Sequence, residues 1–546
     1  MSILRRSILT ANKDIVLDVS VIIDLWVREN SAEITESLID ESVATGVKLW
    51  VAAPALATLD YVAKKVLKRK GVSTDKVKPL VAALMNNLLS FVSVLTSYGF
   101  DRKEIYEAAH DFEDAQIAAT ARSLSGSEVC IVTEDGSFDN LGEISARTPA
   151  EALVWIRDAS DNNAAEIPFV NLAAQQRAIF PRLEKGIHKV LTHGRYIMGP
   201  EVKELEEKLA TDALLMALMA KSIGPGDAIF TTPFTFIATA EVISLLGATP
   251  VFVDIDPQTF NIDPDKLKLA IQALKANDAS IHPLPKHAEL SPKGIITVDL
   301  FGLPCDYDKI NAVAEAEGLF VIEDGAQGLG GEYKGRKACS LGDIGCTSFF
   351  PAKPLGCYGD GGAVFTDDDE IAEIMASIRV HGKGGHKYDN ARIGLNARLD
   401  TLQAAILIPK LAAFPKELEA RRQVATRYTN LLSDSDNLKL TTPHIPSGLQ
   451  SAWAQYSILA ENSECRSNIQ NTLKGAGIPT AIYYPKPLHL QTAYKYLGYK
   501  EGSFPISEDC SQRIFSLPMH PYLEDKQIEL IAEKLFHTEP QRHRGE

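Results

Sequence analysis

Short apolar runs alternate with amphipathic stretches along most of the 546-residue chain. The runs have the length of buried strands and the stretches have the spacing of helices, a pattern typical of α/β folds with a parallel sheet. Before residue 158, strands are predicted at 15–17, 21–26, 49–52, 91–95 and 129–132. The pattern therefore predicts an α/β domain over residues 1–157.

A polar segment, DASDNNAAEI, interrupts this alternation at residues 158–167. It has no apolar period, and we interpret it as a linker. The alternation then resumes, with strands predicted at 228–231, 250–253, 294–298, 319–322 and 362–365. This predicts a large, doubly wound α/β domain over residues 168–400.

The pattern becomes helical at residues 401–432, with breaks expected near Pro409 and Pro415. A mixed α+β tail follows, so residues 401–546 are predicted to form a smaller C-terminal domain. An apolar stretch at residues 80–100 carries no formal charge, but it contains several polar residues. We interpret it as a buried helix that runs into a buried strand, and no membrane association is expected.

The charge balance restricts the function. Lys+Arg number 56 and Asp+Glu 71, which gives a net charge of −15 and argues against a broad nucleic-acid surface. The seven cysteines are scattered and never spaced as C-x-x-C. They indicate reduced thiols without structural zinc, and the first residues do not resemble a signal peptide. We therefore expect a cytoplasmic protein.

Two neighbouring segments carry candidate chemistry, VIEDGAQ at 321–327 and SFFPAKPLGCYGDGGA at 348–363. They contain the groups that an enzyme dependent on pyridoxal phosphate requires. Lys353 can form a Schiff base, Asp324 can keep the pyridine nitrogen protonated, and Ser348 can bind the phosphate. Singly, each is more often a solvated lysine or a helix cap. Together and in this order, they favour a transaminase.

From about residue 169 to 536 the sequence resembles the DegT–StrS family of nucleotide-sugar aminotransferases. The resemblance is carried by the two segments above and by further motifs, HGRYIMGPE at 193–201, TPFTFIATA at 232–240, NARLD at 396–400 and SLPMHP at 516–521. It implies the fold type I aminotransferase architecture. The lysine segment is most similar to the branch that aminates UDP-linked 2-acetamido-3-keto-glucuronate for surface polysaccharide synthesis.

The resemblance assigns roles around the cofactor. Lys353 would be the Schiff-base lysine and Asp324 the partner of the pyridine nitrogen. Gln327 would bond the ring hydroxyl, Ser348 would bind the phosphate, and Phe236 would stack on the ring.

The resemblance also assigns roles in substrate binding. Asn396 would reach the cofactor phosphate of a neighbouring subunit and Arg398 its substrate, which implies a homodimer. Tyr483 and Tyr484 would line the cleft for the UDP-sugar. The expected amino donor is glutamate.

One segment departs from the family pattern. Residues 207–210 run directly into Thr211, where the family has a longer segment that supplies a strand and a glycine beside the phosphate. Residues 201–221 contain no Gly or Pro and repeat apolar residues at helical spacing, which predicts one uninterrupted helix. Thr211, otherwise a phosphate ligand, would then lie in mid-helix. An impaired aminotransferase scaffold is therefore the alternative function.

Acidic residues follow the predicted strands of the N-terminal domain. Asp18 ends the first strand, Asp135 follows the last, and Asp111 and Asp114 lie between them. Carboxylates that converge at strand ends suit Mg²⁺ or Mn²⁺, and such a site can cleave phosphodiesters. The alternative is that these residues are helix caps and solvated strand ends.

This arrangement resembles a PIN domain, a fold of many ribonucleases, over roughly residues 12–157. The resemblance makes Asp18, Asp114 and Asp135 metal ligands, with Asp111 nearby, and it puts Asp60 where PIN nucleases usually have Glu. A basic run could contact RNA, although a solvated helix face explains it better; its members are Lys64, Lys65, Lys68, Arg69 and Lys70.

Overall fold

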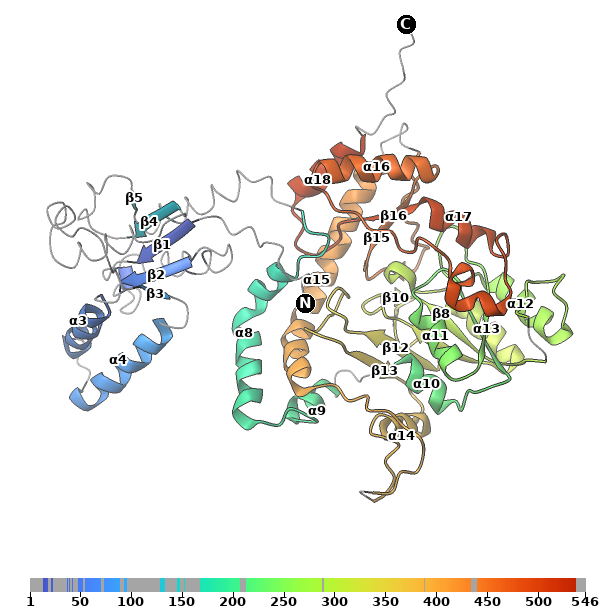
Figure 1. Cartoon of the computed structure of the whole chain (residues 1–546), viewed down its shortest axis with the longest axis horizontal. Helices are drawn as coiled ribbons and strands as arrows, with labels where there is room; N and C mark the ends of the chain where they lie inside the picture. Colours follow the sequence, from blue (N-terminus) through green and yellow to red (C-terminus); the bar gives the residue numbers. More distant parts are fainter. Residues whose placement is uncertain are drawn as a thin grey trace, which may run out of the picture. The chain divides into compact units, whose positions relative to one another are not determined.

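The chain divides into two units, Met1–Glu166 and Ile167–Glu546 (Figure 1). The structure, a computed structural model, describes residues 167–536 apart from 207–212, 287–288, 387 and 434–438. In the first unit it describes residues 13–17, 48–52, 55–69, 73–88, 93–95, 128–132 and 145–147, with the single residues 21, 22, 37, 39, 42 and 152.

A parallel five-stranded sheet is the centre of the first unit. Its order is β3-β2-β1-β4-β5, with β1 (Lys13–Leu17), β2 (Lys48–Ala52), β3 (Ser93–Leu95), β4 (Glu128–Val132) and β5 (Ser145–Arg147). Residues 15–17 of the central strand are at most 1 % exposed. Helices α3 (Ala55–Arg69) and α4 (Thr74–Leu88) pack on each other. The predicted parallel sheet is confirmed.

The predicted strand at 21–26 is wrong where it can be checked, because Val21 and Ile22 are helical and buried. Both elements bury apolar pairs, so a short apolar run does not distinguish them. Residues 80–100 contain the end of α4 and the strand β3, as predicted. Within the described residues, no helix is long and apolar enough to cross a membrane.

A six-stranded sheet of order β13-β12-β9-β8-β6-β7 forms the centre of the second unit. Every neighbouring pair is parallel except β12 with β13. The strands are β6 (Asp227–Thr231), β7 (Thr249–Phe252), β8 (Ser291–Val298), β9 (Phe320–Asp324), β12 (Ile344–Ser348) and β13 (Gly362–Phe365). The pattern does not predict β12, whose sequence IGCTS is short and partly polar.

Helices cover both faces of this sheet, because successive strand residues point to opposite sides. On one face, Phe230, Ile295 and Val321 pack with α12 (Pro264–Ala276) and α13 (Tyr307–Glu317). On the other, Ile229, Ile296 and Ile322 pack with α10 (Leu214–Ala220), α11 (Ala238–Leu245) and α14 (Asp369–Ile378). The prediction of a doubly wound domain is confirmed.

The prediction of one helix over residues 201–221 is wrong. Helix α9 (Pro200–Glu206) and helix α10 are separate elements, and Ala213 lies outside α10 as its N-cap. The two helices bury their apolar faces in different places: Val202 and Leu205 pack with Leu399 beside α15, whereas α10 packs on the sheet. Thr211 lies outside the described residues.

Helix α15 (Thr401–Ser433) runs without a break through Pro409 and Pro415, so the predicted breaks are wrong. A proline inside a helix costs roughly 3 kcal/mol. Packing outweighs this cost because α15 lies against α8 (Leu172–His193) and α9 and contributes to two cores. Ala404 and Leu407 pack beside the large sheet, and Val424 and Tyr428 pack in the C-terminal part.

The C-terminal part is mixed α+β, as predicted. An antiparallel pair, β15 (Tyr456–Leu459) and β16 (Ile514–Leu517), packs with α15, α16 (Ser463–Gly475) and α18 (Asp525–Phe536). The remaining elements are a small sheet of β10 (Glu332–Tyr333), β11 (Arg336–Lys337) and β14 (Leu449–Gln450), the 3-10 turns η1 (Leu300–Gly302), η2 (Leu488–Leu490) and η3 (Thr492–Leu497), and helix α17 (Pro505–Arg513).

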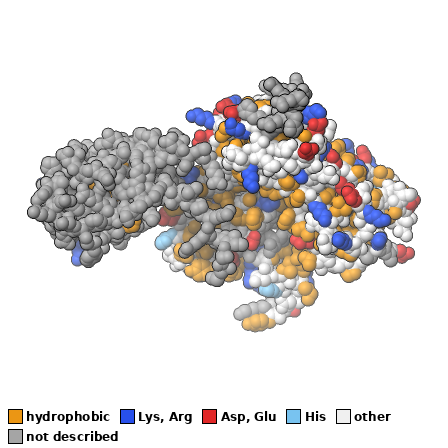
Figure 2. Space-filling model, turned by 45° about the horizontal axis from the view of Figure 1, so that its top comes forward, with side chains coloured by type: hydrophobic (Ala, Val, Ile, Leu, Met, Phe, Trp, Pro, Cys, Tyr) orange, Lys and Arg blue, Asp and Glu red, His pale blue; other side chains and the backbone are white. Residues whose placement is uncertain are grey.

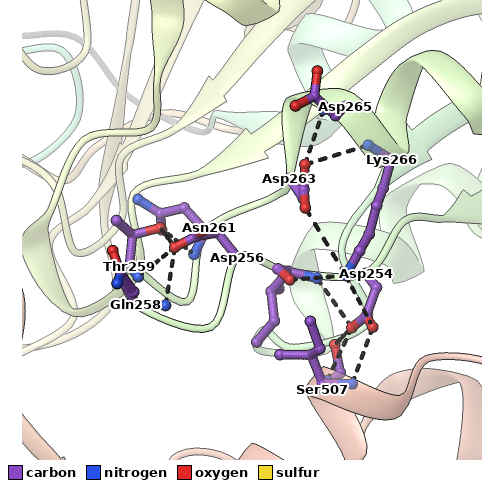
Figure 3. A network of polar contacts seen from close by, with 11 residues as sticks. Asp254, Asp256, Gln258, Thr259, Asn261, Asp263, Asp265, Lys266 and Ser507 are labelled. Carbon is purple, nitrogen blue, oxygen red and sulfur yellow. Dashed lines mark hydrogen bonds and ion pairs between the residues drawn. The ribbon is translucent and has the colours of Figure 1, made fainter.

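A buried carboxylate fastens α17 to the large domain (Figure 3). Asp254, only 3 % exposed, follows β7 and accepts hydrogen bonds from three donors in the first turn of α17. These are the backbone N–H of Ile506 at 3.0 Å and the N–H and hydroxyl of Ser507 at 2.9 and 2.6 Å. The carboxylate thus caps the helix and favours its positive end. Lys266 lies 3.5 Å away.

We expect Asp254→Ala to lower the free energy of unfolding of the second unit by about 2–4 kcal/mol, because buried donors lose their acceptor. Urea denaturation followed by circular dichroism measures this. Asp265→Ala is the control: this side chain lies in the same region but is 82 % exposed, and its removal should change stability by less than about 0.5 kcal/mol. Equal effects of the two substitutions would contradict the capping role.

Candidate active site

Two adjacent parallel strands bring Asp324 and Ser348 to the same edge of the large sheet. Asp324 is the last residue of β9 and Ser348 the last of β12, and the register pairs Asp324 with Cys346. Lys353 follows in the loop after β12. Parallel α/β sheets bind ligands at the carboxyl ends of their strands. The predicted acid, hydroxyl and lysine therefore come from one region of the fold.

Asp324 is held by short contacts in a buried environment, with 5 % of its surface exposed. The hydroxyl of Thr239, in the first turn of α11, donates to one carboxylate oxygen at 2.7 Å. The N–H of Ala326 donates to the other at 3.2 Å. Burial raises the pKa of Asp324, while the Thr239 hydrogen bond, the Ala326 N–H and the charge of Lys353 oppose the rise.

Lys353 is half-buried, and it interacts electrostatically with Asp324. Burial lowers the pKa of Lys353, because the charged ammonium loses water. The negative charge of Asp324 opposes this shift. The arrangement favours an amine that can lose its proton more readily than a surface lysine, as a nucleophile must.

Gln327 is buried, and its amide has one defined orientation. Its Oε1 accepts a hydrogen bond from the N–H of Phe301 at 2.6 Å, and its Nε2 donates to the hydroxyl of Tyr484 at 3.0 Å. Phe301 has a positive φ of 59°, an uncommon conformation for a bulky residue that points its N–H toward the amide. Because a backbone N–H can only donate, the oxygen of the Gln327 amide must face Phe301. The Nε2 group therefore faces Tyr484.

Aromatic rings lie beside these polar groups. The Phe236 ring is 57 % exposed and lies 6.3 Å from the Tyr484 ring. Tyr483 lies 5.8 Å from Tyr484 and 6.3 Å from Phe169. Burial raises the pKa of Tyr484, so its hydroxyl stays protonated and can donate as well as accept. An exposed ring beside buried polar groups is suited to stack on a planar ligand.

The remaining predicted residues are placed differently. Ser348 accepts a hydrogen bond from the N–H of Phe350 at 3.2 Å, which leaves its own hydrogen free to donate. Asn396 is exposed, and Arg398 is half-buried with its Nε unpaired among the described residues. The role of both residues in a neighbouring subunit stays a prediction.

The predicted metal site of the first unit involves five acidic residues. Asp18, Asp111, Asp114 and Asp135 lie outside the described residues, and Asp60 is described only as part of helix α3. Of the basic run, Lys64 is half-buried, Lys65, Lys68 and Arg69 are exposed, and Lys70 is not described. Among the described residues, no group of three or more His, Cys, Asp or Glu could hold a metal ion.

The donor set around Asp324 fits pyridoxal phosphate: a buried carboxylate with free lone pairs, a partly desolvated amine, an oriented amide donor and an exposed ring. The model of the DegT/DnrJ/EryC1/StrS aminotransferase family matches residues 181–536. The chain belongs to this family. It has the fold type I architecture and is a sugar aminotransferase dependent on pyridoxal phosphate, and the family transaminates keto nucleotide sugars.

Three relatives illustrate the match. A UDP-2-acetamido-2-deoxy-3-oxo-D-glucuronate aminotransferase of Pseudomonas aeruginosa is 44 % identical over 383 residues, 68 % of this chain and 99 % of the relative. A family member from Brucella abortus has a TM-score of 0.63 and 48 % identity over 67 % of this chain and 98 % of its own. NtdA from Bacillus subtilis, solved with the bound cofactor PMP, has a TM-score of 0.58 and 27 % identity, and the match covers 66 % of this chain and 82 % of NtdA.

Sequence reasoning missed two residues that position the family site. Thr239 lies inside the TPFTFIATA motif, three residues after Phe236, and this position in a motif of the family could have marked it as a site residue. Phe301 acts through its backbone N–H and its positive φ, and neither can be predicted from the identity of the residue. Both hold the groups that would contact the cofactor.

We expect Asp324→Asn to lower the pKa of Lys353 further, because burial then acts without the opposing charge. The pH dependence of acetylation of Lys353 in the cofactor-free protein, followed by peptide mass spectrometry, measures this. Asp360→Asn is the control, since Asp360 is exposed in the same loop and does not act on Lys353. An unchanged or raised pKa in Asp324→Asn would show that the two side chains are not electrostatically coupled.

Proposed function

We propose that this enzyme transfers an amino group to the keto carbon of a UDP-linked sugar, of the 2-acetamido-3-oxo-glucuronate class, for surface polysaccharide synthesis in the cytoplasm. Glutamate is the proposed amino donor. The observation that carries the proposal is the buried Asp324, which Thr239 holds at the carboxyl end of β9, beside the strand that leads into the Lys353 loop. The 44 % identity with the Pseudomonas aeruginosa enzyme over nearly its whole length supports the sugar class.

When bound, pyridoxal phosphate supplies an electron-withdrawing ring that eases proton removal at the carbon exchanging its amino group. Lys353 would hold the cofactor covalently through Nζ and, once released, carry the proton between carbon atoms. Asp324 would hold a proton on the ring nitrogen, and its burial strengthens that contact because little water competes. Thr239 fixes the carboxylate for this task through its 2.7 Å hydrogen bond.

Other side chains would orient the cofactor and substrate. The Nε2 group of Gln327 would donate to the ring hydroxyl, and Ser348 and Thr211 would bind the phosphate. Phe236 would stack on the ring, and Tyr483 and Tyr484 would line the entrance for the nucleotide sugar.

The proposed assembly is a homodimer in which Asn396 and Arg398 serve the partner's site. Asn396 is exposed, and the buried Nε of Arg398 has no hydrogen-bond partner among the described residues. Exposed apolar residues on α8 and the loop after it support a protein contact there; they are Phe180, Leu191, Tyr196, Ile197 and Met198. Hydrophobic side chains are also visible at the surface of the second unit in Figure 2.

The test is turnover by the full chain with pyridoxal phosphate, glutamate and UDP-2-acetamido-2-deoxy-3-oxo-glucuronate, with the amino sugar measured by mass spectrometry. Lys353→Ala should reduce turnover on the order of a thousandfold or more. Lys337→Ala, an exposed lysine, should leave it unchanged. Preference for a dTDP-linked keto sugar would contradict the sugar class. No turnover with any keto sugar would favour the impaired scaffold.

We propose a metal-dependent ribonuclease activity for the first unit, as a PIN-like domain with Asp18, Asp114 and Asp135 as Mg²⁺ or Mn²⁺ ligands. The supporting observation is the parallel sheet with β1 in the centre and β4 beside it. In the sequence, Asp18 directly follows β1 and Asp135 closely follows β4. Parallel strands that are neighbours end at the same edge of a sheet.

We expect the full chain to cleave single-stranded RNA with Mn²⁺, and Asp114→Asn to reduce the cleavage rate by about a hundredfold or more, because the metal loses a ligand. Gel electrophoresis of a labelled RNA measures this. Lys353→Ala should cleave as the parent does. Cleavage that persists in Asp114→Asn or without a divalent metal would refute the proposed metal site.

A further inference from the structure

The segment that carries Lys353 forms a closed loop. At its base, the N–H of Phe349 donates to the carbonyl of Gly361 at 2.7 Å, and the N–H of Cys357 donates to the carbonyl of Phe349 at 2.8 Å. The N–H of Lys353 donates to the carbonyl of Phe350 at 2.9 Å. The position of the Lys353 amine therefore depends on what holds this loop.

Helix α15 holds the loop at two places, both after Lys353 in the sequence. Gln403 makes two hydrogen bonds to the backbone of Tyr358, accepting from its N–H at 2.9 Å and donating to its carbonyl at 3.2 Å. Lys410 donates to the carbonyl of Gly356 at 2.7 Å, and its Nζ lies 4.2 Å from the centre of the Tyr358 ring. Gln403 and Lys410 are seven residues apart, so they lie on one face of the helix, two turns from each other.

Lys410 is an unfavourable residue for this position, because its ammonium is buried. Its exposed fraction is 0 %, and its ammonium donates a hydrogen bond to a backbone carbonyl, that of Gly356. Burial lowers the pKa of Lys410 to about 8, against the opposing charges of Glu417 on α15 and Cys357 in the loop. Glu417 itself accepts hydrogen bonds from Gln175 and Tyr522. A buried ammonium whose burial is only partly offset by an opposing charge destabilises a fold relative to an apolar side chain of the same size.

We propose that Lys410, with Gln403, is a positioning residue that fixes the Lys353 loop against α15. The inference rests on the proposed role of Lys353 as the cofactor lysine. The hydrogen bond to Gly356 and the contact with the Tyr358 ring restrain the loop three to five residues after Lys353. A reacting amine must be held within a fraction of an ångström of its target, which a loop closed only on itself does not ensure.

The test separates positioning from stability. Pyridoxal phosphate is added to the cofactor-free full chain, and the growth of the visible absorption band is followed by stopped flow. We expect Lys410→Met to form the band and turn over about ten- to a hundredfold more slowly than the parent. Its thermal unfolding midpoint should stay unchanged or rise, because a buried charge is replaced by an apolar chain. Lys416→Met, an exposed lysine on the same helix, is the control and should match the parent.

Gln403→Glu is the second variant, in case Lys410→Met does not fold. It keeps an acceptor for the Tyr358 N–H, but it replaces the donor to the Tyr358 carbonyl with a charged oxygen that repels this carbonyl, so it should detach the loop locally and slow band formation. Band formation at the parent's rate in either folded variant would overturn the proposal. Slow band formation in Lys410→Met together with a lowered thermal unfolding midpoint would overturn it too, because general destabilisation would then explain the slow rate. A parent protein whose visible band does not depend on Lys353 would instead overturn the proposed function, and this inference with it.

Discussion

The electrostatic coupling of Asp324 and Lys353 is the constraint around which the candidate active site is arranged. Each charge is unfavourable by itself at the edge of the sheet, since burial raises the pKa of the acid and lowers that of the amine. Each offsets part of the other's cost. A site that keeps both groups partly desolvated is able to bind a cofactor that needs an acid at one end and an amine at the other.

The fold supplies the rigidity that this contact requires. The carboxyl ends of β9 and β12 set the acid and the start of the lysine loop side by side. Thr239 from α11 fixes the carboxylate, and Phe301 fixes the amide of Gln327. The Asp254 carboxylate fastens α17 to the large domain, in the part of the chain that also carries Tyr484. Elements far apart in the sequence thus converge on one site.

Most of this architecture could be predicted from the sequence, because strand and helix periods are local and the motifs of the family site are contiguous. The failures have non-local causes. Apolar residues at helical spacing predict a single helix over residues 201–221, but α9 packs beside α15 and α10 packs on the large sheet. The breaks at Pro409 and Pro415 do not occur because packing on α8 and α9 outweighs the lost backbone bonds. The roles of Phe301 and Lys410 depend on contacts that no local pattern contains.

The central claim is that one lysine, Lys353, forms the covalent bond with the cofactor. Reduction of the protein–pyridoxal phosphate complex with borohydride, followed by peptide mapping, tests it directly. The account predicts a pyridoxyl group on the peptide that contains Lys353 and on no other in stoichiometric amount. Labelling of a different lysine such as Lys410, or no stoichiometric labelling, would contradict it.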